Sequence, residues 1–191
     1  MPRIEPVPIQ HFDPQTQATL KQIVAENRAS SHTFLRILGY HPLYLQQTVA
    51  GLQTRDFEGL LGSRLLELIR LRSAQIGGCD ECSRARYSAD VSEADVACVV
   101  AGSDGDLSAR ERLALRYVTL MHTDHHRVDD DFFRELKCYF STAEIIELAM
   151  VTGTLLGHHR FLHALDILGN DAPVIAFDPA QIAARHPEAD A

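Results

Sequence analysis

The part of the sequence that decides the fold is residues 66–82, LELIRLRSAQIGGCDEC, where a long apolar-faced helical segment meets a C-x-x-C pair. Cys79 and Cys82 follow two glycines directly, and the pair stands where the next helix is expected to start. Two thiols three residues apart can close a small disulfide, and the free N–H groups of a helix N-terminus stabilise a thiolate. The segment therefore predicts consecutive helices joined at a site for redox or metal chemistry.

The helix that leads into the pair is predicted over about residues 57–75. At about 100° per residue its aliphatic side chains cover one broad face, formed by Leu60, Leu61, Leu65, Leu68, Ile69 and Leu71. Glu67 lies at the edge of that face, so we expect a boundary residue. Two interpretations of it stay open. It forms a salt bridge to Arg64 or Arg70, each three residues away, or it is a half-buried carboxylate that passes protons to a cysteine.

Zinc is the alternative to redox chemistry for the cysteine pair. A four-thiolate site needs a second pair at similar spacing, but Cys98 and Cys138 stand alone inside apolar helical patterns, where we expect small buried hydrophobes. Histidines could complete a site, and two clusters offer them: His122, His125 and His126, and His158, His159 and His163. Because the pair sits between helices rather than on a knuckle between short strands, we expect no metal.

The composition is typical of a folded domain. With 191 residues, 46% of them hydrophobic, the chain can bury a core as one domain or as two small helical lobes. Its net charge is −8, from 18 Lys and Arg against 26 Asp and Glu, and no basic run offers a stripe for phosphates. We therefore expect no nucleic-acid partner.

The sequence also predicts a cytoplasmic location. The first residues, MPRIEP, lack the charged-then-apolar pattern of a signal peptide, and no apolar stretch approaches the roughly 20 residues that span a bilayer. No membrane partner is expected. In a reducing compartment a lasting structural disulfide is uncommon, so a C-x-x-C pair there more often cycles or binds metal.

Helix-start signals recur along the chain without a convincing alternating strand pattern, so the fold class is predicted as all-α. Asp13-Pro14 and His41-Pro42 each open a helix, the first reaching toward Ala25. Serine caps open three more, at Ser92, at Ser108 with Glu111, and at Ser141 with Glu144.

These signals divide one predicted domain into parts. N-terminal helices occupy residues 1–55, a motif-bearing helical core occupies 56–101, and C-terminal helices occupy 107–169. The loop AGSDGD at 101–106 is the predicted hinge. The irregular tail at 170–191 is expected to cover a neighbouring subunit.

Residues 66–82 resemble the signature of the carboxymuconolactone decarboxylase and alkylhydroperoxidase D superfamily, which is a helix bearing a glutamate, a short break and a C-x-x-C pair. In that signature the glutamate precedes the first cysteine by twelve residues, as Glu67 precedes Cys79 here. Further segments resemble the family at residues 34–42, 107–115, 140–148 and 159–160. The resemblance implies an alkylhydroperoxidase D-like helical bundle that forms a homo-oligomer, a trimer, hexamer or dimer.

The resemblance also implies a thiol-dependent hydroperoxide reductase that needs no metal or haem. It assigns Glu67 as the proton-relay carboxylate, Cys82 as the thiol that attacks a small hydroperoxide, and Cys79 as the resolving thiol. A thiol or lipoyl-type donor would then reduce the disulfide. General chemistry leaves the attacking cysteine open, because the first cysteine of such a pair is often the more acidic one.

The chain departs from the peroxidatic pattern at two positions. The histidine expected four residues after the second cysteine is Arg86, and an arginine, with a pKa above about 12, cannot shuttle protons near neutral pH. Glu81, directly before Cys82, opposes thiolate formation by its charge. The resemblance is thus to a divergent branch, in which a histidine from elsewhere, His159 first among them, is the auxiliary candidate for the relay.

Two alternatives to the peroxidase hypothesis remain. A decarboxylase-type lyase would process a small organic acid with acid and base residues, but that branch does not use a C-x-x-C pair. A non-catalytic oligomeric protein would use the Cys79–Cys82 disulfide as a structural or redox-sensing element, and Arg86 favours this hypothesis.

Overall fold

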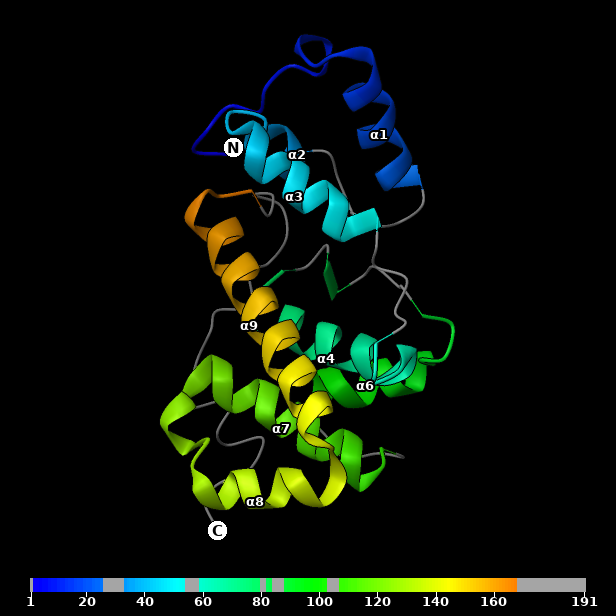
Figure 1. The fold of residues 1–191 in the computed structure, drawn as a ribbon, viewed down its shortest axis with the longest axis vertical. Coiled ribbons are helices and arrows are strands. Elements are labelled where there is room, and N and C mark those ends of the chain that lie inside the picture. Colours follow the sequence, from blue (N-terminus) through cyan, green and yellow to red (C-terminus); the bar gives the residue numbers. More distant parts are fainter. Residues whose placement is uncertain are drawn as a thin grey trace.

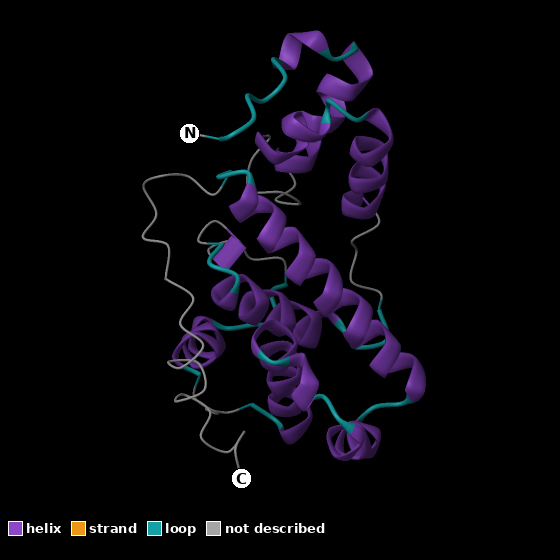
Figure 2. Cartoon of the chain, turned by 90° about the vertical axis from the view of Figure 1, so that its left-hand side faces the viewer, coloured by secondary structure: helices purple, strands orange, loops and turns teal. Residues whose placement is uncertain are grey.

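The computed structural model describes residues 2–25, 33–53, 59–79, 82–83, 88–102 and 107–167. Within these ranges it contains eight α-helices and no strand, which confirms the predicted all-α class. Figures 1 and 2 show how these helices are arranged. The helices are α1 (Pro14–Ala25), α2 (Thr33–Leu38), α3 (Pro42–Gln53), α4 (Ser63–Ile76), α6 (Glu93–Ala101), α7 (Ala109–Thr123), α8 (Asp130–Tyr139) and α9 (Thr142–Ala164). Most of the predicted hinge loop and the predicted tail lie outside the described residues.

Five predicted helix starts are confirmed, at Pro14, Pro42, Glu93, Ala109 and Thr142. Side-chain caps satisfy free N–H groups of the first turn at all of them except Pro42. At α1, Asp13 Oδ1 accepts from the backbone N–H groups of Gln15 and Thr16, both at 3.0 Å, and Pro14 takes the first helical position. Reciprocal capping boxes begin α6, α7 and α9, formed by Ser92 with Asp95, Ser108 with Glu111, and Ser141 with Glu144.

Helix α4 lies at the centre of the bundle. It packs against α6, α7 and α9, while α8 packs against α9. In Figure 1 the long helix α9 runs from α8 at one end of the molecule toward α1–α3 at the other. The N-terminal segment is tied to the C-terminal end of α9, since the Arg3 backbone N–H donates to the Leu165 carbonyl at 2.8 Å. Ile37 of α2 packs in one apolar cluster with Ala74 and Cys79, so the end of α4 that leads into the cysteine pair faces the N-terminal layer formed by α1–α3.

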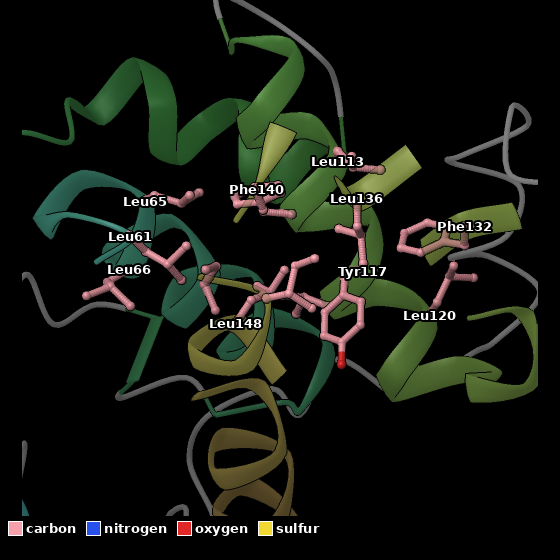
Figure 3. Packing of buried hydrophobic residues seen from close by; sticks show 14 of the residues in the cluster. Leu61, Leu65, Leu66, Leu113, Tyr117, Leu120, Phe132, Leu136, Phe140 and Leu148 are labelled. Carbon is pink, nitrogen blue, oxygen red and sulfur yellow. The ribbon is translucent and has the colours of Figure 1, made fainter. Parts of the chain in front are cut away.

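The largest apolar cluster fills the space between α4, α7, α8 and α9 (Figure 3). Its most deeply buried members, none of which has measurable exposure, are Ile69, Ala114, Val118, Leu136 and Leu148. Smaller clusters lie between α4, α6 and α7, around the cysteine pair, and within α1–α3. At roughly 25 cal/mol per Å² of apolar surface, this burial is the main term that stabilises the bundle.

The prediction of a single apolar face on the central helix is wrong. Leu60, expected on that face, precedes α4 and is 63% exposed, and residue 57 lies outside the described residues. Within α4 every residue from 65 to 74 is buried, including Glu67, which is therefore no boundary residue. The physical reason is that α6, α7 and α9 together surround the helix, so its polar side chains must find partners inside the protein.

Cys138 is exposed and Cys98 is only partly buried, so the expectation that both lie in the core is wrong. Helix α8 buries Phe132 and Leu136, which are four residues apart on one face. Cys138 lies two residues beyond Leu136, on the opposite side.

Among the described residues no single helix is long and apolar enough to cross a membrane, although α8 and α9 pass that test together across a 116° bend.

Candidate functional site

The end of α4 delivers Cys79 to the centre of the site through a Schellman motif. Gly78 adopts a left-handed φ of 67°, and its N–H donates to the Gln75 carbonyl at 3.2 Å. The Cys79 N–H donates to the Ala74 carbonyl at 2.9 Å, and the two side chains belong to one apolar cluster. This pattern ends a helix and reverses the chain, with glycine at the left-handed position.

Cys79 also begins the turn that holds its partner. Its Sγ accepts from the Cys82 backbone N–H at 3.2 Å, and its carbonyl accepts from the Ser83 N–H at 2.9 Å. The two cysteines form a disulfide with their Cα atoms 5.2 Å apart. The same residue therefore closes one helix, opens the next turn and carries a reactive sulfur.

The two sulfurs differ in their access to solvent. Cys79 is 1% exposed and Cys82 is half-buried. Ile37 of α2 and Leu162 of α9 pack around the disulfide, together with the partly buried Phe34. Residues of α2 and α9 thus cover Cys79, and Cys82 is the more exposed residue of the pair.

Helix α9 brings His159 to the pair. Ligand atoms of Cys79, Cys82 and His159 all lie within 4.8 Å of one another, and His159 is 1% exposed. Gly77 makes this approach possible, because a Cβ at that position would lie 2.7 Å from Cβ, Cγ and Nδ1 of His159. The structure therefore places the leading auxiliary histidine of the sequence beside the cysteines, 77 residues further along the chain.

A buried chain of hydrogen bonds runs inward from His159. Ser73 Oγ lies 3.3 Å from His159 Nδ1 and 2.8 Å from His122 Nε2. The serine can donate its O–H to His122 while it accepts from His159 Nδ1, and this arrangement leaves Nε2 of His159 unprotonated. Burial lowers the pKa of His122 to about 4 and that of His159 to about 3, with smaller contributions from neighbouring positive groups. Both imidazoles are therefore neutral at neutral pH beside the uncharged disulfide.

Glu67 is engaged by an arginine rather than by a cysteine. Its two oxygens accept from Arg70 Nε and Nη2, both at 2.7 Å, and both residues are almost completely buried. Arg70 Nη1 also donates to the Cys82 carbonyl. The interpretation of Glu67 as a salt-bridge residue is confirmed with Arg70 as its partner, and its role as a proton relay stays a prediction.

The other predicted positions are distributed as follows. Arg64 pairs with Asp95 and Glu111 at the opposite end of α4. Glu81 and Arg86 lie outside the described residues. His163 Nε2 lies 2.6 Å from the Gly77 carbonyl, next to the site, but its side chain is exposed. The further predicted histidines are His125 and His126, exposed beyond the end of α7, and His158, stacked edge-on against Phe34.

Sequence analysis alone does not identify Ser73 and Gly77 as parts of the site. Each carries a signal in retrospect, because a serine inside an apolar helix needs a buried partner and a helix-ending glycine permits close approach. The element that approaches them is α9, which is distant in the sequence, so the local sequence gives no signal of the contact.

Comparisons of the chain with models of known protein families, with curated proteins and with solved structures find no match. The chemistry of the site is therefore inferred from its own residues. A disulfide with one accessible sulfur and a neutral imidazole beside it can carry out thiol–disulfide exchange, and its reduced form offers two thiols and an imidazole in one place.

Proposed function

We propose that the protein is a thiol-dependent hydroperoxide reductase whose redox centre is the Cys79–Cys82 pair. The observation that carries this proposal is the disulfide itself, with one covered and one half-buried sulfur and with His159 beside it. A protein of a reducing compartment such as the cytoplasm, which we propose as its location, keeps such a pair for cycling more often than for structure.

The proposed cycle transfers two electrons from the two thiols to one peroxide molecule. The Cys82 thiolate attacks the terminal peroxide oxygen, so that an S–O bond forms, the O–O bond breaks and the alcohol leaves with a proton. Cys79 then attacks the sulfur of the Cys82 sulfenic acid, which forms the disulfide and releases water. A small thiol or lipoyl-type dithiol restores both thiols by disulfide exchange and is itself oxidised.

We assign the attack to Cys82 because it is the more accessible sulfur. Cys79 is packed under Ile37 and Leu162, where it can reach the Cys82 sulfur but hardly a bulky peroxide. Arg70 Nη1 donates to the Cys82 carbonyl, but the charge of this guanidinium is offset by Glu67. Exposure is therefore the observation that favours Cys82.

His159 takes the place of the histidine that Arg86 replaces. It lies beside both sulfurs, and a thiolate raises the pKa of an adjacent imidazole, so reduction of the disulfide makes this group a better proton acceptor. Glu67 fixes Arg70 through two hydrogen bonds and so acts as a positioning residue for the pair.

Cysteine substitution tests the proposal most simply. Cys82→Ser and Cys79→Ser should each abolish catalytic peroxide consumption, and Cys82→Ser should also prevent formation of a sulfenic acid that a dimedone-type reagent can trap. Cys138→Ser is the matched control, because this exposed cysteine lies outside the site and its loss should leave turnover unchanged. Unchanged turnover in both site variants would contradict the proposal.

The redox-sensing alternative is supported by one contact of the disulfide. Ile37 of α2 packs in the same cluster as Cys79, so breaking the S–S bond can change how the N-terminal layer sits on α9. Under this alternative, reduction lowers the melting temperature while peroxide is consumed only at the buffer rate. Calorimetry and peroxide consumption on the same reduced sample distinguish the two functions.

A further inference from the structure

We propose that the reduced site is a zinc site, with the thiolates of Cys79 and Cys82 and a ring nitrogen of His159 as its three protein ligands. Zinc binding and disulfide formation are then alternative states of the same pair. This proposal needs the three side chains to converge but does not need the peroxide chemistry, so each can fail without the other.

The spacing of the ligand atoms fits the ion. In a tetrahedral site with Zn–S of about 2.3 Å and Zn–N of about 2.0–2.1 Å, neighbouring ligand atoms lie roughly 3.5–3.8 Å apart. The three atoms here lie within 4.8 Å of one another, and the cysteine Cα atoms are 5.2 Å apart. Once the S–S bond opens, rotation of the two cysteine side chains is enough to reach the required distances, and no helix has to move.

The donor set selects the class of metal. Thiolates and imidazole bind zinc and copper, whereas magnesium and calcium require oxygen ligands. Two thiolates and a neutral imidazole also balance the charge of Zn²⁺, which matters in a place where Cys79 and His159 are each 1% exposed. Without a metal, two thiolates here would repel each other in a medium that solvates them poorly.

Groups behind the ligands hold them in place. Ser73 bonds Nδ1 of His159, in the arrangement in which a metal-binding histidine donates its other N–H to a fixed oxygen. Arg70 fixes the Cys82 carbonyl, and Gly77 leaves the space that the imidazole occupies. In the sequence alone, a single cysteine pair argues against zinc. In the structure, His159 of α9 supplies a third ligand.

The three ligands leave one position of a tetrahedral zinc to be filled. Among the described residues three groups of metal-binding type converge here, and a four-coordinate zinc would take its fourth ligand from water or from a small external anion. The half-buried Cys82 marks the side from which that ligand enters. Oxidation releases the ion, since one hydroperoxide and two protons convert the two thiolates to a disulfide, an alcohol and water.

The experiment uses the full chain, reduced, freed of reductant and metal, and titrated with ZnCl₂ against a chromophoric chelator. We expect one equivalent of Zn²⁺ per chain, bound at least tenfold more tightly than by the disulfide form. Co²⁺ in place of zinc should give thiolate-to-metal charge-transfer absorption. Equal zinc affinity of the reduced and disulfide forms, or Co²⁺ spectra without thiolate bands, would overturn the proposal.

Variants identify the third ligand. His159→Gln should weaken zinc binding at least tenfold, whereas His163→Gln, an exposed histidine on the same helix, should not. In the unaltered protein, zinc should slow alkylation of Cys79 and Cys82 but not of Cys138, as mapped by peptide mass, and this measurement does not depend on how well the variants fold. Equal alkylation rates with and without zinc would also overturn the proposal. Peroxide turnover of the metal-free protein tests the proposed function separately.

Discussion

The N-terminal end of α4 and its enclosed end, which we define as the stretch from Glu67 to the cysteine pair, carry similar charged groups in different surroundings. At the N-terminal end Arg64 binds Asp95 at 2.8 Å and Glu111 at 2.7 Å, and its side chain is 35% exposed. In the enclosed end, Arg70 at the middle of α4 binds Glu67 at 2.7 Å with its side chain 4% exposed, three residues before Ser73 and nine before Cys79. Arg64 is partly exposed to solvent, whereas Arg70 is buried.

The difference in exposure distinguishes the cluster around Arg64, which joins helices, from the Glu67–Arg70 pair, which lies next to the cysteine site. Asp95 and Glu111 are also the capping-box acids of α6 and α7, so Arg64 joins three helix N-termini. The hydrogen bond from Arg64 is the main cause that holds the pKa of Asp95 below its usual range. A buried ion pair, by contrast, adds little stability compared with apolar residues of the same volume. The observed link of this pair to the site is the hydrogen bond from Arg70 to the Cys82 carbonyl.

The largest expected effect comes from breaking the enclosed pair. Glu67→Leu removes the carboxylate that binds Nε and Nη2 of the buried Arg70 and should lower the free energy of unfolding by about 3–5 kcal/mol. The double variant Glu67→Leu/Arg70→Met should recover most of that loss. Urea unfolding measures both. If the single and double variants are equally unstable, the pair does not act as a unit.

The next effect concerns the approach of α9 to the site. Gly77 has ordinary helical φ and ψ, so Gly77→Ala is destabilising only because its Cβ would meet His159 at 2.7 Å. We expect a loss of about 1–3 kcal/mol, as for other overpacked sites, together with slower thiol chemistry. Gly153→Ala is the matched control, since nothing lies within 4 Å of its Cβ and alanine favours helix by about 1 kcal/mol. A harmless Gly77→Ala would show that His159 is not held against α4.

Acid should lower the stability contributed by the N-terminal end and by the enclosed end of α4 in different pH ranges. The pKa of His122 is about 4 in the folded protein, below the ordinary value near 6.5, so the unfolded chain takes up the proton first and stability falls as pH falls. From pH 7 to pH 5.5 this histidine should account for about 1 kcal/mol of lost stability. His122→Gln should remove this share of the slope and leave the share of His159, whose pKa is about 3. His125→Gln, at an exposed site, should leave the slope unchanged.

The carboxylates at the N-terminal end act only at lower pH. The folded pKa of Asp95 lies below its unfolded value of about 3.9, so its stabilising contribution is complete above that pH and is lost as pH falls further. A slope between pH 7 and 5.5 that His122→Gln leaves unchanged would contradict the assignment of that range to the enclosed end.

The smallest effect is expected at Arg64, the partly exposed arginine. Arg64→Met should lower the free energy of unfolding by about 0.2–1 kcal/mol, because partly exposed ion pairs are screened by solvent. The loss should shrink in 1 M NaCl. A loss as large as that of Glu67→Leu would remove the distinction between the two ends.

Local signals of the sequence predicted the local structure. The caps at Asp13, Ser92, Ser108 and Ser141 form as expected, because each depends on residues within one turn. The burial of Glu67 and the exposure of Cys138 could not be predicted in this way, since both depend on which helices surround α4 and which face of α8 is covered. The oligomeric state and the family resemblance stay predictions.

The two cysteines of the site could be predicted from the sequence, but the side chains packed around them could not. The C-x-x-C pair identifies Cys79 and Cys82 directly, and histidine clusters name His159 and His122 as candidates. Their meeting at Ser73 depends on how α7 and α9 pack on α4, which spacing along the chain does not encode.

The central claim is that the enclosed end of α4 carries a working dithiol. The most direct test follows intact mass and free-thiol count of the reduced, metal-free protein after one equivalent of hydroperoxide, with peptide mapping of the product. We predict rapid loss of two hydrogens and a new disulfide between Cys79 and Cys82, while Cys98 and Cys138 stay free. Thiols that survive as long as those of free cysteine under the same conditions would contradict the account.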